Sequence, residues 1–289
     1  MYLFLPLASS ILYVIATLFL KQASARGIDI WRTAFVCNTA TAILFLFLWP
    51  FGGEPIRLSL LWQPLVVAVL FVLAQVLNFL ALKIGDVSVA TPVMGSKVVL
   101  VALFTTLLGA GSVPPPLWIA AVLSGVGLGF LNRKGESRHE HILRTVLLAL
   151  SAAASYAIFD VLVMTWSPAW GVGRFLPLVM IMSALLSLGF VPLFRKRALP
   201  EATVSQRPLY LGAFFIALQA LILVSTLGLF GNATAVNVIY STRGLWSVLA
   251  VWWLGHLFAN NERAQGNSVF RARLIGAVCL CAAVVLVFL

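Results

Sequence analysis

The chain is a succession of long apolar segments separated by short polar ones. We place the apolar segments at residues 3–21, 33–50, 62–82, 88–108, 115–131, 143–165, 175–194, 208–229, 234–256 and 271–289. At about 1.5 Å rise per residue, a helix of roughly 20 residues crosses the ~30 Å hydrocarbon core of a bilayer. The shorter alternating segments typical of a membrane β-barrel do not occur in this pattern. The pattern therefore predicts ten transmembrane helices.

Composition agrees with this reading. Of the 289 residues, 62% are hydrophobic and 9% are charged, and the mean hydropathy is +1.07. Soluble domains carry about 25% charged residues. The net charge of +11 does not indicate a nucleic-acid partner, because the basic residues lie in short connections and not along one face. We therefore expect an all-α membrane protein whose surroundings are the lipid bilayer.

The basic residues also predict an orientation. Of the 19 Lys and Arg residues, 15 lie in or beside the odd-numbered connections, and only Arg57 and Arg174 lie in the even-numbered ones. Lys and Arg concentrate in cytoplasmic loops. The odd connections are therefore expected in the cytoplasm, which places both termini outside it.

An internal repeat organises the chain. The stretch GDVSVATPVMGSK, residues 85–97, recurs 146 residues later as GNATAVNVIYSTR, residues 231–243, so that Lys97 corresponds to Arg243. Outside this stretch the match is weaker: Tyr13 and Thr17 correspond to Tyr156 and Asp160 at an offset of 143 residues, and Gln75 corresponds approximately to Gln219. The copies start five spans apart, and an odd number of spans reverses the direction of entry. We therefore expect two inverted five-helix repeats, residues 1–134 and 135–289, around a central cavity.

Three charged residues fall within the predicted spans. Lys97 and Arg243 lie about ten residues from either end of their spans, too deep for a lysine stem to reach the interface. Asp160 is the only acidic residue inside a span. One interpretation is a charge-paired helix bundle, in which Asp160 neutralises one cation. Because a second cation is then left over, and charges at this depth are costly, we favour a binding site for a substrate or coupling ion.

Further side chains are candidates for the same site. Tyr240 and Trp246 flank Arg243 at spacings of three residues, and Tyr156 precedes Asp160 by one turn. Aromatic stacking on a cation or a ligand is one interpretation, and plain packing is the other. Gln75 and Asn78 share a helix face and either line the cavity or join helices.

Two proline and glycine features have their own predictions. Pro92 removes a backbone donor from its span, so it indicates either a hinge beside the cavity or a tolerated kink. The segment SGVGLGFL, with Gly125 and Gly129, is typical of close helix packing in membranes and not of phosphate binding.

No catalytic or metal-binding motif occurs. The chain has no HExxH sequence, no Walker loop, no nucleophile elbow and no pair of catalytic carboxylates. His139 and His141 have no neighbouring third ligand, and the three cysteines fall within spans. We therefore expect neither an enzyme nor a cofactor nor a metal site.

Ten short-looped spans in two repeats, with KIGDVSVATPVMGSKVV in the fourth and NATAVNVIYSTRGLWSV in the ninth, resemble the drug/metabolite transporter superfamily, EamA type. The resemblance implies a basket of helices around a central cavity, alternating access, and gradient-driven efflux or exchange. It departs at two points: the acidic residue that the family often has after the fourth span is absent, and many relatives have both termini in the cytoplasm.

The sequence therefore predicts a secondary transporter of a small polar metabolite, anionic or zwitterionic, such as an amino acid. Lys97 and Arg243 would bind it, and Asp160 would couple transport to protons. Export of hydrophobic or cationic drugs is the alternative within transport. A membrane scaffold or lipid-handling subunit is the alternative outside it. The sequence gives neither the oligomeric state nor the direction of transport.

Overall fold

The computed structural model describes residues 2–84, 90, 93–131, 142–194, 205–254 and 266–288, and within these ranges the chain is helical without strands. The first part contains α1 (Phe4–Ala25), α2 (Ile30–Phe45), η1 (Leu46–Phe51), η2 (Leu58–Leu60), α3 (Trp62–Ile84), α5 (Lys97–Leu107) and α6 (Pro115–Leu131). The second contains α7 (Ile142–Trp170), α8 (Val172–Leu186), η3 (Ser187–Leu193), α9 (Arg207–Phe230), α10 (Ala233–Tyr240), α11 (Arg243–Leu254) and α12 (Gly266–Val287).

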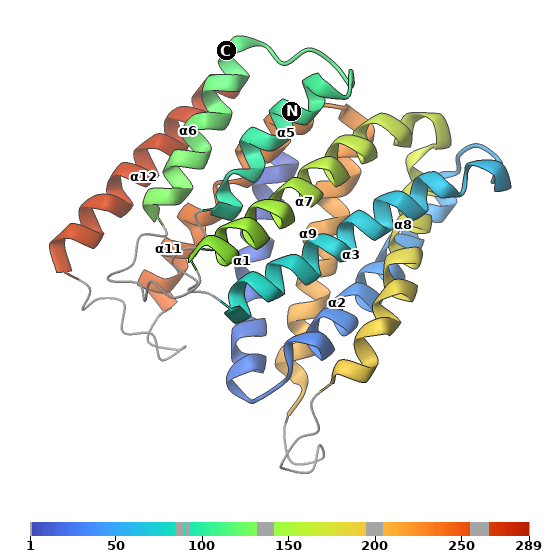
Figure 1. The fold of residues 1–289 in the computed structure, drawn as a ribbon, viewed down its shortest axis with the longest axis horizontal. Helices are drawn as coiled ribbons and strands as arrows, with labels where there is room; N and C mark the ends of the chain where they lie inside the picture. The colour runs from blue at the N-terminus through green and yellow to red at the C-terminus, as the bar shows by residue number, and fades with distance from the viewer. Residues whose placement is uncertain are drawn as a thin grey trace.

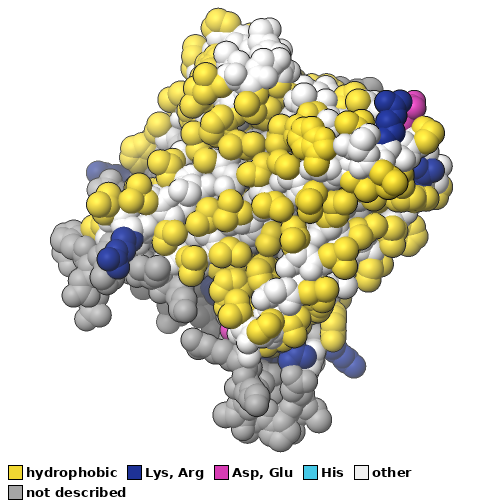
Figure 2. Space-filling view, turned by 45° about the vertical axis from the view of Figure 1, so that its right-hand side comes forward, with side chains coloured by type: hydrophobic (Ala, Val, Ile, Leu, Met, Phe, Trp, Pro, Cys, Tyr) yellow, Lys and Arg dark blue, Asp and Glu magenta, His cyan; other side chains and the backbone are white. Residues whose placement is uncertain are grey.

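The predicted all-α membrane class is confirmed in the described residues, while ten spans in two inverted repeats stay a prediction. Among the described residues, six segments are long and apolar enough to cross a membrane, and three shorter apolar helices, Val93–Leu107, Pro115–Leu131 and Leu274–Val287, accompany them. In Figure 2, hydrophobic side chains cover most of the visible face over the helices, and Lys and Arg side chains lie towards its margins. This distribution suits a molecule surrounded by lipid.

The helices of the two parts interleave. α1 packs along α9 and α3 packs along α7, while α6 and α12 form a pair of their own. Figure 1 shows α6 and α12 side by side at one edge of the molecule, with α2 and α8 towards the other edge. α5 contacts α7, and both α10 and α11 contact α1. Residues 132–141, which hold the expected boundary between repeats, lie outside the described residues.

Within the described residues, the predicted fourth and ninth spans, 88–108 and 234–256, are each interrupted. A turn at Ser96 separates residues 93–95 from α5, and a turn at Ser241 and Thr242 separates α10 from α11. Hydroxyl groups explain both interruptions: Ser96 Oγ donates to the Val93 carbonyl at 2.7 Å, and Thr242 Oγ1 donates to the Ile239 carbonyl at 2.7 Å. Such bonds compete with the helical backbone pattern. Each interruption lies directly before a basic residue.

Other predicted boundaries shift for local reasons. α7 continues through Pro168 to Trp170 and ends at Gly171, whose φ of 76° leaves the helical region. Proline near the last turn of a helix removes only one backbone donor, so the helix survives it. The second and seventh spans change to 3₁₀ geometry in their last turns, as η1 and η3, where Pro50 and Pro192 occur.

The expected glycine packing face is only partly right. A Cβ on Gly127 would lie 2.9 Å from the Gly276 carbonyl oxygen, so the closest approach of α6 and α12 is at this pair. A Cβ on Gly125 would make ordinary contacts with Val99, and one on Gly129 would meet nothing within 4 Å. The small residue that the α6–α12 crossing needs is therefore Gly127 and not Gly129.

Candidate functional site

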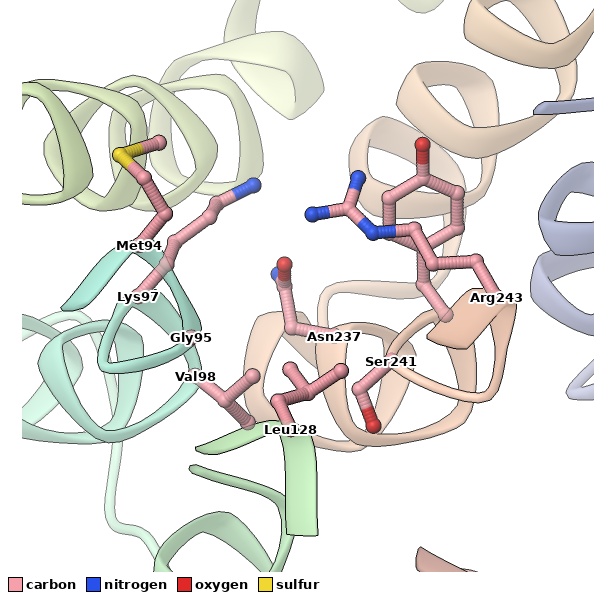
Figure 3. Close-up of a pocket in the computed structure, with 9 residues that line it drawn as sticks. Met94, Gly95, Lys97, Val98, Leu128, Asn237, Ser241 and Arg243 are labelled. Carbon is pink, nitrogen blue, oxygen red and sulfur yellow. The ribbon is translucent and has the colours of Figure 1, made fainter. Parts of the chain in front are cut away.

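The two basic residues that follow the helix interruptions face one pocket. Lys97 begins α5 and Arg243 begins α11, and Figure 3 shows their side chains extending towards each other across the pocket, with Asn237 between them. The remaining lining comes from Met94, Gly95, Val98, Leu128, Tyr240 and Ser241. Lys97 and Arg243, which correspond to each other across the sequence repeat, therefore lie at the same pocket.

Asp160 neutralises Lys97. Its Oδ2 lies 2.7 Å from Lys97 Nζ, and the exposed fractions of the two side chains are 15% for the lysine and 4% for the aspartate. The same oxygen accepts a hydrogen bond from Asn237 Nδ2 at 2.8 Å, and this amide also donates to the Ala233 carbonyl at 2.9 Å. The Lys97 ammonium lies 5.7 Å from the Tyr156 ring centroid. A buried ion pair with these extra contacts holds α5, α7 and α10 together.

Arg243 is held in a different way. Its guanidinium carbon lies 4.7 Å from the Tyr13 ring centroid and 4.6 Å from that of Tyr240, while the two rings stand edge to face at 6.0 Å. Across the described ranges, no acidic side chain forms an ion pair with this guanidinium. Aromatic faces attract a cation but carry no net charge. Within the described residues, the positive charge of Arg243 beside the pocket therefore has no acidic partner.

The repeat explains the difference between the two cations. Lys97 and Tyr156 correspond to Arg243 and Tyr13, and each basic residue indeed lies against the tyrosine of the other half. Asp160, however, corresponds to Thr17, whose hydroxyl donates to the Val14 carbonyl at 2.8 Å. Of the two corresponding positions, Asp160 thus supplies an acid to Lys97, whereas Thr17 carries only a hydroxyl that bonds within α1.

Tyr240 is fixed by a polar cluster behind the pocket. Its hydroxyl donates to Gln219 Oε1 at 3.0 Å, and Ser9 Oγ donates to the backbone carbonyl of Gln219 at 2.9 Å. Ser10 Oγ and Thr242 Oγ1 lie 3.2 Å apart. These contacts tie α1 and α9 to the interruption before Arg243, so the tyrosine faces are held in place around the guanidinium.

Three other candidates lie away from the pocket lining. Gln75 forms a reciprocal amide pair with Asn38, at 2.9 and 3.0 Å, which joins α3 to α2. Asn78 is half-buried one turn further along α3. Trp246 lies one turn after Arg243 on α11, and its Nε1 is buried without a hydrogen-bond partner in the described structure. Pro92, the predicted hinge, lies outside the described residues.

Sequence reasoning missed Asn237 and Tyr13 as site residues. Asn237 is a polar residue deep in a span, six positions before Arg243 in the repeated motif, so its position was a usable signal. Tyr13 could have been found by transferring Tyr156 across the repeat. Met94, Val98 and Leu128 are ordinary apolar residues, and nothing in the sequence distinguishes them from packing residues.

The pocket is nearly closed in this conformation. The volume that the centre of a water-sized sphere can occupy is about 10 Å³, which is room for a single water molecule. A metabolite-sized ligand needs several hundred Å³. Binding such a ligand here requires the helices that carry Lys97 and Arg243 to move apart.

Comparison with known proteins places these observations in context. A solved structure titled only "Crystal structure of protein" is similar over 100% of this chain and 99% of its own, with a TM-score of 0.74 and 16% sequence identity. At this identity the likeness shows the fold alone. No curated protein matches the chain.

The comparison with family models agrees with the resemblance that the motifs indicated. The model of the EamA-like transporter family matches residues 1–133, the part of the chain from α1 to α6. This family suggests a multi-pass membrane transporter. Residues 1–133 are therefore similar to the EamA-like transporter family, which belongs to the drug/metabolite transporter superfamily.

Proposed function

We propose that the protein is a secondary transporter of a small anionic or zwitterionic metabolite, and that Arg243 is the anchor for the anionic group. The observation that carries this proposal is the difference between two buried cations. Asp160 neutralises Lys97, while Arg243 lies against the rings of Tyr13 and Tyr240 and has no acidic partner among the described residues. A guanidinium binds a carboxylate with two parallel hydrogen bonds. The substrate carboxylate would supply the missing negative charge.

The architecture that we propose is ten spans in two inverted five-helix repeats. Exchanging the halves converts the α1–α9 contact into the α7–α3 contact, and the α5–α7 contact into the α11–α1 contact, and all four contacts occur. The α2–α8 and α6–α12 pairs are each converted into themselves. Such an exchange supports a pseudo-two-fold axis through the pocket, around which the halves would alternate between two openings.

Asp160 is the coupling residue in this proposal. When it is ionised it holds Lys97, so the pocket carries one net positive charge from Arg243. Protonation of its carboxylate breaks the ion pair and adds one positive charge, which changes the affinity of the pocket for an anion. A proton gradient can therefore bias binding on one side of the membrane and release on the other.

The experiment is a thermal-shift measurement on the purified chain with three probes: glutamate, leucine and the cation tetraphenylphosphonium. A ligand that binds the folded state raises its unfolding temperature. We expect glutamate or leucine to raise the unfolding temperature of the parent protein but not that of Arg243→Gln. Arg57→Gln, which removes a charge at an exposed position, should respond like the parent protein.

Other outcomes would overturn the proposal. If only tetraphenylphosphonium raised the unfolding temperature, the export of hydrophobic cations would be favoured. If glutamate or leucine raised the unfolding temperature of Arg243→Gln as much as that of the parent protein, the anchor would lie elsewhere. Wild-type protein that binds a metabolite but moves none across vesicle membranes would indicate a scaffold or lipid-handling role.

A further inference from the structure

Several buried hydroxyl groups lie in the membrane region without a partner. In the described part of the chain, the buried side-chain polar atoms that lack a hydrogen bond are Ser124 Oγ, Ser167 Oγ, Ser225 Oγ, Thr234 Oγ1 and Trp246 Nε1. A hydroxyl in a helix normally donates to a carbonyl one turn earlier, as those of Thr165 and Thr226 do at 2.8 and 2.7 Å. Unpaired buried polar groups are rare and usually have a task.

Ser167 and Thr234 are placed in relation to Asp160. Ser167 follows Asp160 by seven residues on α7, which is two turns on the same face and about 10 Å along the helix axis. Thr234 precedes Asn237, the residue that donates to Asp160, by one turn on the same side of α10. The exposed fractions of Ser167 and Thr234 are 0% and 2%.

The position of Gly228 indicates the order in which Ser167, Thr234 and Asp160 lie along the α7 axis. A Cβ on Gly228 would lie 3.0 Å from Ser167 Oγ, so the bare backbone of α9 leaves space at the hydroxyl. Gly228, near the end of α9, lies beside Ser167, and Asn237 on α10 donates to Asp160. Because α10 follows α9 in the chain, we infer that α10 runs antiparallel to α7, from the level of Ser167 to that of Asp160. Thr234 therefore lies between the two levels, and the order is Ser167, Thr234, Asp160.

We infer that these hydroxyls form the proton route to Asp160, from the end of the molecule at which α7 ends and α10 begins. A hydroxyl donates and accepts at the same time, so with intervening water it passes a proton along a chain of hydrogen bonds. A proton taken from water at that end converts the Asp160 carboxylate to the carboxylic acid and frees Lys97. The inference rests on the coupling role of Asp160 proposed above.

The charges around Asp160 suit this assignment. The titratable groups near it are Lys97 on α5, Tyr156 on α7 itself, and Arg243, Tyr240 and Tyr13 on the far side of Asn237. α3, α8 and α9, which also pack against α7, have no titratable side chain in their central turns. Among the described residues, Ser167 and Thr234 are the buried unpaired hydroxyls on α7 and α10, the helices that carry Asp160 and Asn237.

Infrared spectroscopy of the full chain in lipid tests the route without a substrate. At a pH that protonates Asp160, its C=O stretch is the band missing from Asp160→Asn, and transfer to D₂O shifts that band as deuterium replaces the proton. We expect Ser167→Ala with Thr234→Val to slow the exchange by roughly tenfold or more, the effect of one ordinary hydrogen bond on a barrier. Gly228→Ala, which crowds the Ser167 hydroxyl, should slow it as well.

The control is Ser124→Ala, which removes a buried unpaired hydroxyl on α6 and should exchange at the parental rate. Unfolding temperatures show whether each variant is folded. If the double variant and Gly228→Ala both exchange like the parent, the route is wrong, while the coupling role of Asp160 is untouched. If instead Asp160→Asn leaves pH-driven uptake unchanged, the proposed coupling fails, whatever the exchange rates.

Discussion

At the scale of single residues, the site depends on which of two cations forms an ion pair with its one acidic residue. Asp160 lies 2.7 Å from Lys97, and Arg243 has tyrosine faces in its place. Removing one partner of a buried ion pair leaves the other charge without compensation, and this is usually more costly than removing both.

Asp160→Asn should therefore lower the free energy of unfolding by about 3–5 kcal/mol, because Lys97 is then left unpaired. Lys97→Met combined with Asp160→Asn should recover most of that loss. Unfolding of the purified variants in detergent measures both. Equal stability of the single and double variants would mean that the ion pair does not hold α5 to α7.

The residues of the site were predictable where charge marked them. Lys97, Arg243 and Asp160 stand out because charges are rare in spans, and the structure brings all three to one region. The sequence does not show which of the two cations pairs with Asp160, because this pairing depends on how the helices pack. Gln75 shows the same limit: its polarity is visible in the sequence, but its amide pair with Asn38 is a tertiary contact.

At the scale of helices, close backbone approach decides how α6 and α12 cross. A Cβ on Gly276 would lie 2.6 Å from the Gly127 carbonyl oxygen and 2.9 Å from the Leu131 backbone nitrogen. Side chains cannot shift to relieve contacts with backbone atoms, so the helices themselves would have to separate. The sequence marked this face by its glycines, but only the packing shows which glycine is needed.

Gly276→Val should therefore destabilise the protein, whereas Gly129→Ala, whose added methyl group meets nothing within 4 Å, should not. Alanine also has the better helix propensity, by about 1 kcal/mol, so the control should be neutral or stabilising. Expression yield and unfolding temperature report both effects. A Gly276→Val variant as stable as the parent would show that α6 and α12 do not cross so closely.

Helix interruptions were the part of the elements that hydropathy could not predict. The fourth and ninth spans are apolar segments in the sequence, yet each contains a turn directly before a basic residue. The bonds of Ser96 and Thr242 to carbonyls one turn earlier are local, but serine and threonine also make such bonds inside unbroken helices, as Thr165 does. The interruption therefore depends on the surrounding helices as well.

At the scale of the whole molecule, the distribution of basic residues predicts the orientation. Fifteen of 19 lie at odd-numbered connections, so we propose that both termini lie outside the cytoplasm. Alkaline phosphatase fused to the C-terminus should be active and green fluorescent protein should be dark. The opposite pair of results would place the termini in the cytoplasm and reverse the direction assigned to every span.

The central claim is that Arg243 binds the anionic group of the transported molecule. Its most direct test is uptake of labelled glutamate and leucine into vesicles that contain the protein, under an imposed pH gradient. We predict that Arg243→Gln weakens the apparent affinity by roughly 10- to 100-fold, as the loss of a charge-assisted hydrogen bond of about 1.5–3 kcal/mol implies, while Arg57→Gln transports like the parent protein. Parental uptake by Arg243→Gln would contradict the account.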